Sequence, residues 1–197
     1  MSSERISAGN TALLLIDHQV GTMNWVRSIA YEDMKRNVLL LAKTAQIAKL
    51  PVVLSSSMEG DAPGPLLSEL ESLLPEAFAA RVRRAGMTKT LNAMDDLAFA
   101  EAVQAIGRKN IVIAGAALDM SIEFTAQSLV QLGYRVHVIV DAGGWRNQAD
   151  SFASLNHMAQ AGVTVSSTRS AIAQLVGNWR MPEGSQVLDV MEEIFQR

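Results

Sequence analysis

The sequence predicts a three-layer α/β fold in which helices cover both faces of a six-stranded parallel sheet. Short runs rich in Val, Ile and Leu alternate with longer segments whose apolar residues recur at helical spacing. A glycine stands where each of three helices should stop before the next strand, at Gly107, Gly133 and Gly162. Because crossovers between parallel strands are right-handed, the expected strand order is 3-2-1-4-5-6.

The expected strands are short apolar runs without the alternation of a half-exposed sheet. Continuous runs of this kind are typical of strands buried on both faces. They cover residues 11–16, 51–54, 110–114, 135–140 and 163–165.

The expected helices lie between these strands. The first, over residues 33–49, places Met34, Val38, Leu41 and Ala45 on one face. Further helices are predicted over residues 66–74, 95–106, 119–132, 148–161 and 170–176. The tail from residue 180 to 197 also has helical apolar spacing, and it could pack on its own core or on a partner subunit.

Composition favours a single domain spanning residues 1–197. The chain is 49% hydrophobic and 19% charged, so it has enough apolar material for one buried core. With 17 Lys plus Arg against 20 Asp plus Glu and no basic block, nucleic acid is not an expected partner. The longest apolar runs are too short to cross a membrane, so we expect no membrane partner and a cytoplasmic location.

Several common active-site types have no support in the sequence. The chain has no cysteine, and it lacks the G-x-S-x-G, G-x-G-x-x-G and P-loop motifs, which argues against thiol, esterase, dinucleotide and nucleoside-triphosphate sites. The three histidines, His18, His137 and His157, are far apart in sequence. We therefore expect neither a metal site nor a cofactor, and His18 is the one histidine beside the expected ligand crevice.

That crevice should lie beyond the carboxyl ends of the strands, as in other open parallel sheets. Asp17 directly follows the first apolar run, where its carboxylate could act as a general base or simply cap the following turn. The segment 115–121 turns from strand to helix and would direct backbone N–H groups at the crevice. Such a turn suits an oxyanion.

Several ordered motifs resemble the isochorismatase-like cysteine hydrolases, the superfamily of nicotinamidases and N-carbamoylsarcosine amidases. The similarity covers about residues 10–180 and is greatest to an uncharacterised bacterial hydrolase branch. The motifs are Asp17-His18-Gln19, Ser55 to Glu59 with Gly64-Pro65-Leu66, Arg83-Arg84 followed by Thr90 to Asp95, Ile113-Ala114-Gly115 and Asp141 to Gly144. The resemblance implies a hydrolase of a small amide or related compound that associates into homo-oligomers.

In that family an Asp base follows the first strand, a Lys or Arg follows the third, and a Cys nucleophile begins the helix after the fourth. Asp17 matches the base, and the cysteine position falls on Ser121. Counting back from Asn92 puts the cation at Thr88, with Lys89 one position later. Lys89 could bend into the crevice or remain solvated. The resemblance also implies an oxyanion hole built on a cis peptide between Ala116 and Ala117.

Serine in place of cysteine has a chemical consequence. A thiol with a pKa of about 8.5 is within reach of an Asp base, whereas a serine hydroxyl is a far weaker acid and normally needs a histidine. A deliberate Cys→Ser replacement would also give a cysteine-free chain. Thr88, Met94 and Leu118 depart from the family pattern as well, which favours natural divergence.

Three functions stay open at this stage. The first is a hydrolase that uses Asp17, Lys89 and Ser121, with N–H groups of Ala117 and Ser121 as oxyanion donors. The second is an inactive member that binds a small ligand or serves as an oligomeric scaffold, and the third is enol-ether hydrolysis by Asp17 as an acid. The expected lining of the small-molecule pocket is Gln19, Trp25, Met58, Asn92, Met94 and Leu118.

Overall fold

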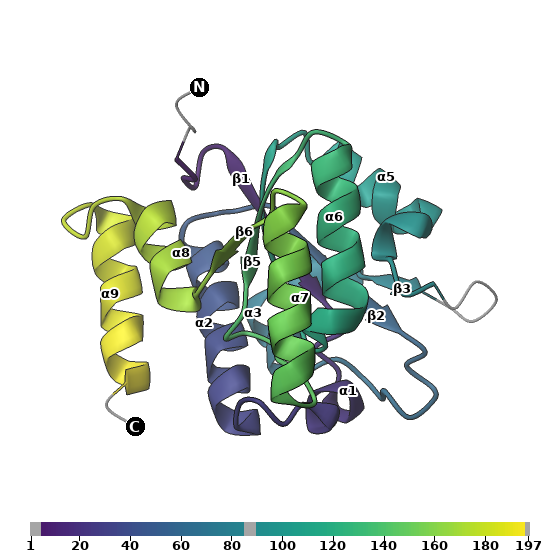
Figure 1. Ribbon diagram of the computed structural model, residues 1–197. Helices are drawn as coiled ribbons and strands as arrows, with labels where there is room; N and C mark the ends of the chain where they lie inside the picture. Colours follow the sequence, from purple (N-terminus) through teal and green to yellow (C-terminus); the bar gives the residue numbers. More distant parts are fainter. Residues whose placement is uncertain (1–4, 85–89, 196–197) are drawn as a thin grey trace.

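The computed structural model describes residues 5–84 and 90–195, and it has the predicted three-layer α/β architecture (Figure 1). One six-stranded sheet has the order β3-β2-β1-β4-β5-β6, and every pairing is parallel. The predicted strand order is thus confirmed. The strands are β1 (Thr11–Ile16), β2 (Val52–Ser57), β3 (Val82–Arg84), β4 (Asn110–Gly115), β5 (Arg135–Ile139) and β6 (Thr164–Ser166).

The two central strands, β1 and β4, are buried along their whole length. They pair over six residues, from Thr11 opposite Asn110 to Ile16 opposite Gly115. Because side chains alternate along a strand, Leu13 and Leu15 pack into one layer while Leu14 and Ile16 pack into the other. This explains why the sequence of β1 is apolar from Ala12 to Ile16.

Helices form the two outer layers. The larger ones on one face are α2 (Tyr31–Ile47), α8 (Thr168–Val176) and α9 (Pro182–Phe195), and on the other face α5 (Leu97–Ala105), α6 (Glu123–Gln131) and α7 (Gln148–Gln160). Shorter helices are α1 (Val20–Trp25), α3 (Glu69–Leu73), α4 (Pro75–Ala79), the 3₁₀ turn η1 (Ala93–Asp95) and the π-helical turn η2 (Leu118–Ile122).

The helix ends marked by glycine in the sequence are where we expected them. Gly107, Gly133 and Gly162 have φ values of 68°, 83° and 88°, the left-handed conformation that glycine adopts without steric cost. Strand β3 was not predicted from the sequence, because it has three residues and two arginines instead of an apolar run. Helices α1 and α4 were not predicted either, because they are too short to show a helical period.

The C-terminal helix α9 packs against α2 and α8 of the same chain, and Figure 1 shows it at the edge of the molecule. Val187 and Met191 of α9 are buried, and Val190 and Ile194 pack against the same core. Of the two alternatives for the tail, packing on its own core is therefore the one present in this single chain. No helix in residues 5–84 and 90–195 is long and apolar enough to span a membrane.

Candidate active site

Asp17 lies directly after β1, where the central strand ends. It is 4% exposed, and its backbone has φ +55°, in the left-handed region where few residues other than glycine, asparagine and aspartate are found. Its N–H donates to the carbonyl of Ser55 at 2.8 Å, which continues the β1–β2 pairing by one residue. The backbone therefore fixes the direction of the Asp17 carboxylate at the carboxyl edge of the sheet.

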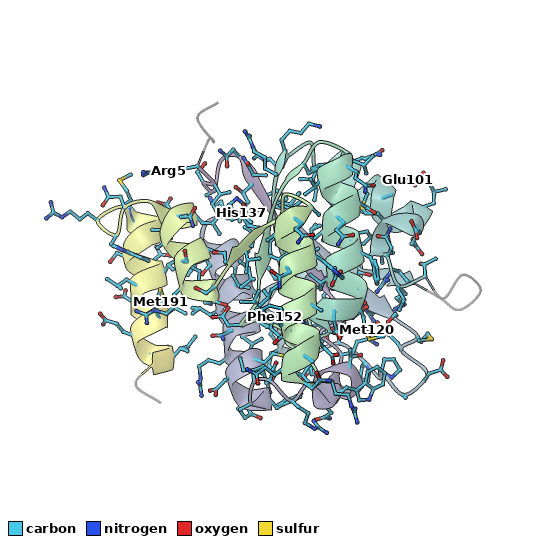
Figure 2. The ribbon with its side chains drawn as sticks, viewed as in Figure 1. Arg5, Glu101, Met120, His137, Phe152 and Met191 are labelled. Atoms are coloured by element: carbon cyan, nitrogen blue, oxygen red, sulfur yellow. The ribbon has the colours of Figure 1, made fainter. Side chains whose placement is uncertain are left out.

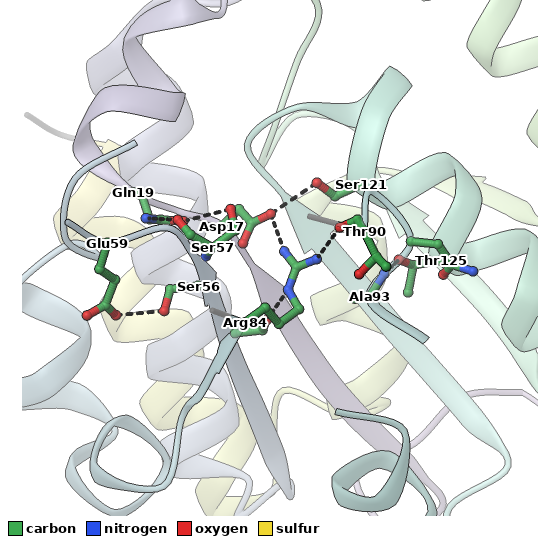
Figure 3. Close-up of polar contacts among 12 residues, drawn as sticks. Asp17, Gln19, Ser56, Ser57, Glu59, Arg84, Thr90, Ala93, Ser121 and Thr125 are labelled. Atoms are coloured by element: carbon green, nitrogen blue, oxygen red, sulfur yellow. Dashed lines mark hydrogen bonds and ion pairs between the residues drawn. The ribbon is translucent and has the colours of Figure 1, made fainter. Parts of the chain in front are cut away.

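Arg84, the last residue of β3, forms a buried ion pair with Asp17 (Figure 3). Its Nη2 donates to Asp17 Oδ2, its Nε donates to Ser55 Oγ at 2.9 Å, and its Nη1 donates to the carbonyl of Thr90 at 3.4 Å. Both side chains are nearly inaccessible, at 5% and 6% exposure. A buried pair of this kind is costly to break, since removing one partner leaves the other charge uncompensated.

Ser121 completes the cluster from the other side of the crevice. It lies in the π-helical turn η2 that leads into α6, and its Oγ donates to Asp17 Oδ2 at 3.0 Å. Asp17 Oδ2 thus accepts from both Arg84 and Ser121. The second carboxylate oxygen, Oδ1, is buried and has no hydrogen-bond partner in the described part of the chain. Single π-turns of this kind occur frequently at functional sites.

A pocket of about 90 Å³ opens above this cluster. The expected pocket residues Trp25 and Met58 line it, as does Ala117. Its charged residues are Asp17 and Arg84, and the hydroxyl-bearing residues Thr22, Ser57, Thr90 and Ser121 also line it, while the rest of the lining is apolar. The full lining is Asp17, Thr22, Trp25, Ser57, Met58, Pro63, Arg84, Thr90, Leu91, Ala117, Met120 and Ser121.

The structure places four of the expected pocket residues elsewhere. Leu118 is fully buried in the core, and Met94 packs against that core. Asn92 caps η1 by accepting from the N–H of Met94 at 3.1 Å, and it donates to Ser128 Oγ at 3.0 Å. Gln19 is buried behind the pocket wall.

Gln19 ties the loop after β2 to the end of β1. Its Nε2 donates to the carbonyls of Ser57, at 2.8 Å, and of Gly64, while its Oε1 accepts from the N–H of Ser57 at 2.8 Å. The loop between these two residues carries Met58 and Pro63 into the pocket wall. Gln19 therefore contributes to the pocket by positioning its wall.

The expectation of a cis peptide between Ala116 and Ala117 is wrong, since no peptide bond among the described residues is cis. The segment instead bridges the loop after β5. Gly144 donates its N–H to the carbonyl of Ala116 at 3.0 Å, and Leu118 donates its N–H to the carbonyl of Gly144 at 3.0 Å. This pairing holds an extended trans backbone, which avoids the cost of about 3–4 kcal/mol of a non-proline cis bond.

His18 does not line the pocket, although Asp17 beside it does. Its Nε2 lies 2.8 Å from the carbonyl of Ala142, while its Nδ1 is buried without a partner among the described residues. Burial lowers the pKa of His18 to about 4, against smaller opposing effects of the Ala142 hydrogen bond and the Asp17 charge. His18 therefore stays neutral at pH 7 and joins the loops after β1 and β5.

Acidic groups line a neighbouring hollow of about 200 Å³, which shares Trp25, Ala117 and Met120 with the pocket. Burial raises the pKa of Asp119 in this hollow, and the charges of Asp150 and Glu123 contribute in the same direction. No group of three or more His, Asp or Glu side chains in residues 5–84 and 90–195 is arranged to hold a metal ion.

Arg84 is the residue that sequence reasoning missed. Counting back from Asn92 pointed to Thr88 and Lys89, and both lie outside the described residues. The useful signal was position relative to the strand, because Arg84 ends the third strand, after which the resemblance implies a Lys or Arg. The three-residue β3 was not recognised in the sequence, so that position could not be located.

The sequence matches the isochorismatase domain over residues 11–170. It is 33% identical over 176 residues to the "probable hydrolase YcaC" of Escherichia coli, covering 89% of this chain and 82% of that protein. Human isochorismatase domain-containing protein 2 is 27% identical over 192 residues, covering 96% and 86%.

Solved structures show the same relationship. YcaC from Pseudomonas aeruginosa, determined with hexane-2,5-diol and covalent acrylamide, superimposes with a TM-score of 0.90 at 31% identity, over 100% of this chain and 96% of that one. The YcaC gene product of E. coli, described as an octameric hydrolase of unknown specificity, gives a TM-score of 0.88 at 31% identity, covering 99% and 91%. The match across most of the sequence, together with these structures, establishes that the chain belongs to the isochorismatase domain family.

Proposed function

We propose that this chain is an isochorismatase-family hydrolase of a small amide or related acyl compound, with Ser121 as the nucleophile. The observation that carries the proposal is the convergence of Ser121 Oγ and Arg84 Nη2 on one oxygen of Asp17. A nucleophile in hydrogen-bond contact with a base that is itself oriented by a third group is the usual arrangement for covalent catalysis. The similarity to YcaC proteins named as hydrolases supports it.

The proposed reaction has two steps. Ser121 Oγ attacks the acyl carbon while its proton moves to Asp17 Oδ2, and the bond to the leaving group then breaks as that group takes the proton. A water molecule next attacks the acyl-serine and gives a proton to Asp17, which returns one to Ser121 Oγ as the free acid leaves. Arg84 stays paired with Asp17 throughout and keeps the carboxylate in place.

Oxyanion stabilisation has to come from donors other than the N–H of Leu118. That group already donates to the carbonyl of Gly144. Ala117 lines the pocket beside Ser121, so we assign its N–H, together with that of Ser121, to the developing oxyanion.

Labelling with a fluorophosphonate probe tests this function. The intact protein is expected to gain one adduct, located on Ser121 by peptide mass spectrometry, and Ser121→Ala should gain none. Ser57→Ala is the matched control, because Ser57 also lines the pocket without contacting Asp17 in the described hydrogen bonds. An adduct on Ser57, or none in the native protein, would contradict a nucleophilic Ser121.

A second candidate is a small-ligand-binding member without turnover. The observation that favours it is the combination of a serine at the nucleophile position with a backbone N–H of Leu118 that is already engaged. Both features weaken acyl transfer and leave the pocket intact. In that case native and Ser121→Ala proteins would behave alike toward the probe.

We also propose that the chain forms a homo-oligomer. The E. coli YcaC gene product is an octamer and resembles this chain along almost its whole length. Large exposed apolar side chains, such as Phe152 on α7 and Leu97 on α5, each 73% exposed, offer surface for association. Figure 2 shows Phe152 projecting from α7.

A further inference from the structure

We propose that the acyl substrate is an activated one, an aryl ester or a thioester of a short uncharged acid, and that unactivated amides are turned over far more slowly. This inference rests on the proposed function and narrows it to one substrate class. It follows from the proton-transfer groups that surround Ser121.

The structure leaves Ser121 without a histidine. All three histidines of the chain lie in the described part, and none of them contacts Ser121: His18 lies against the carbonyl of Ala142, His137 lies within β5, and His157 pairs with Glu123 at 3.1 Å. Asp17 is the proton acceptor that contacts Ser121 among the described residues. A carboxylate is a weaker base than an imidazole, with reference pKa values of about 3.9 and 6.5.

Among the described residues, one oxygen contacts Ser121 and performs the proton transfers. Asp17 Oδ2 accepts from Ser121 and is also the atom that pairs with Arg84. Arginine does not release a proton in proteins, so it cannot act as a general acid. A poorly activated hydroxyl requires an electrophilic carbonyl, and a leaving group that departs as an anion requires no proton from Asp17. Aryl esters and thioesters meet both requirements, whereas an amide meets neither.

The volume and lining of the pocket determine which acyl group can bind. Its volume of about 90 Å³ and its walls of Trp25, Met58, Leu91 and Met120 suit a short apolar chain. The two charges at its floor, on Asp17 and Arg84, are already paired with each other. A charged acyl group would therefore lose its hydration without gaining a partner from these residues.

In acylation, the Oγ–C bond forms and the bond between the acyl carbon and the leaving oxygen or sulfur breaks. The Ser121 proton passes to Asp17, and the leaving group departs as a phenolate or thiolate. Asp17 then releases the proton taken from Ser121 to solvent. In deacylation, Asp17 accepts one proton from the attacking water and passes it to Ser121 Oγ as the Oγ–acyl bond breaks, and the released acid keeps the water's oxygen and its second proton. No oxidant, metal or other co-reactant enters this balance.

Two chromogenic substrates with the same acyl and aryl groups test the inference, namely p-nitrophenyl acetate and p-nitroacetanilide. The ratio of kcat/KM for the ester to that for the anilide is measured in the native protein and in Ser121→Cys. A thiol is more readily activated by a carboxylate, so Ser121→Cys should gain anilide hydrolysis. We expect the native ratio to be larger by about 10²-fold, within the range that general acid–base assistance contributes.

Two controls separate the possible outcomes. Ser121→Ala should lose acetylation of the protein, and the hemisuccinyl ester should be a poorer substrate than the acetyl ester. Equal ratios in native and Ser121→Cys proteins, with acetyl-Ser121 detected in both the ester and anilide reactions, would overturn the activated-ester inference and leave the hydrolase function standing. Absence of acetyl-Ser121 with every substrate would overturn both.

Discussion

Arg84 and Asp17 depend on each other for burial, so removal of the guanidinium should be costly. Arg84→Met keeps most of the side-chain volume but leaves the Asp17 carboxylate buried and uncompensated. We expect the free energy of unfolding at pH 7 to fall by about 3–5 kcal/mol, measured by urea denaturation.

The neighbouring arginine supplies the matched control for that measurement. Arg83 is also in β3, but its side chain is 64% exposed and pairs with Glu59 at the surface. Arg83→Met should change the free energy of unfolding by no more than about 0.5 kcal/mol. Equal losses in the two variants would show that Arg84 contributes through its strand position and not through its buried charge. The double variant Asp17→Asn, Arg84→Met should recover part of the loss.

His18 should make stability depend on pH in a specific window. The pKa of His18 is about 4 in the folded protein, because burial disfavours the charged ring, and 6.5 is its ordinary value. Below pH 6.5 the His18 ring is protonated in the unfolded chain but stays neutral in the folded protein. The free energy of unfolding therefore falls as the pH drops from 6.5 to about 4. The loss should be about 3 kcal/mol at pH 4 relative to pH 7.

The variant His18→Gln isolates this contribution. An amide can still donate to the carbonyl of Ala142 but does not titrate. Urea denaturation at pH 7 and pH 4 should therefore show a smaller loss in His18→Gln than in the native protein, by about 3 kcal/mol. Exposed His157, replaced by Gln, serves as control and should follow the native protein. Parallel losses in all three proteins would exclude His18 as the titrating group.

At the scale of single residues, the sequence located two of the three clustered groups. Asp17 follows a continuous apolar run, which predicts a central strand, and Ser121 lies at the turn from a strand to a helix. Arg84 was missed because its place depends on β3, which has three residues, two of them arginines, and shows no apolar run. The side chain of His18 does not line the pocket, because the left-handed backbone of Asp17 interrupts the alternation of side chains expected after β1.

Among the structural elements, the loop between Ser57 and Gly64 should respond most to a single change. Gln19 holds both of its ends through backbone groups, so Gln19→Met leaves partly buried carbonyl and N–H groups of Ser57 and Gly64 without this partner. We expect a loss of about 3 kcal/mol in the free energy of unfolding. Amide exchange, followed by mass spectrometry, should also become faster over residues 57–64.

Gln46 provides the comparison, because it is an exposed glutamine of α2. Gln46→Met should leave both stability and exchange over residues 57–64 close to those of the native protein. Faster exchange spread evenly over the whole chain of Gln19→Met would point to general destabilisation instead of release of this loop.

Long strands and helices with a clear apolar period could be predicted from the sequence, and short ones could not. The strands β1, β4 and β5 and the long helices α2 and α7 agree with the expected ranges within about two residues at each end. Long helices show their period over several turns, whereas α1, α4 and β3 are too short to show any. The sequence did not predict that the peptide after Ala116 would pair with Gly144, because that contact joins two loops from different crossovers.

For the whole molecule, we expect an assembly larger than one chain. The E. coli YcaC gene product is octameric and shares this fold at a TM-score of 0.88. Light scattering coupled to size-exclusion chromatography at micromolar concentration should give eight times the chain mass of 21.3 kDa. A single species at the mass of one chain would contradict the proposed homo-oligomer.

The left-handed backbone of Asp17 limits which replacement can report on its chemistry. At φ +55°, alanine would add steric strain, so loss of activity in Asp17→Ala would combine a missing carboxylate with a displaced chain end. Asparagine accepts this conformation readily and keeps the side-chain shape. The activity of Asp17→Ala alone would therefore overstate the contribution of the carboxylate. Asp17→Asn is the variant whose activity reports the contribution of Asp17 to proton transfer.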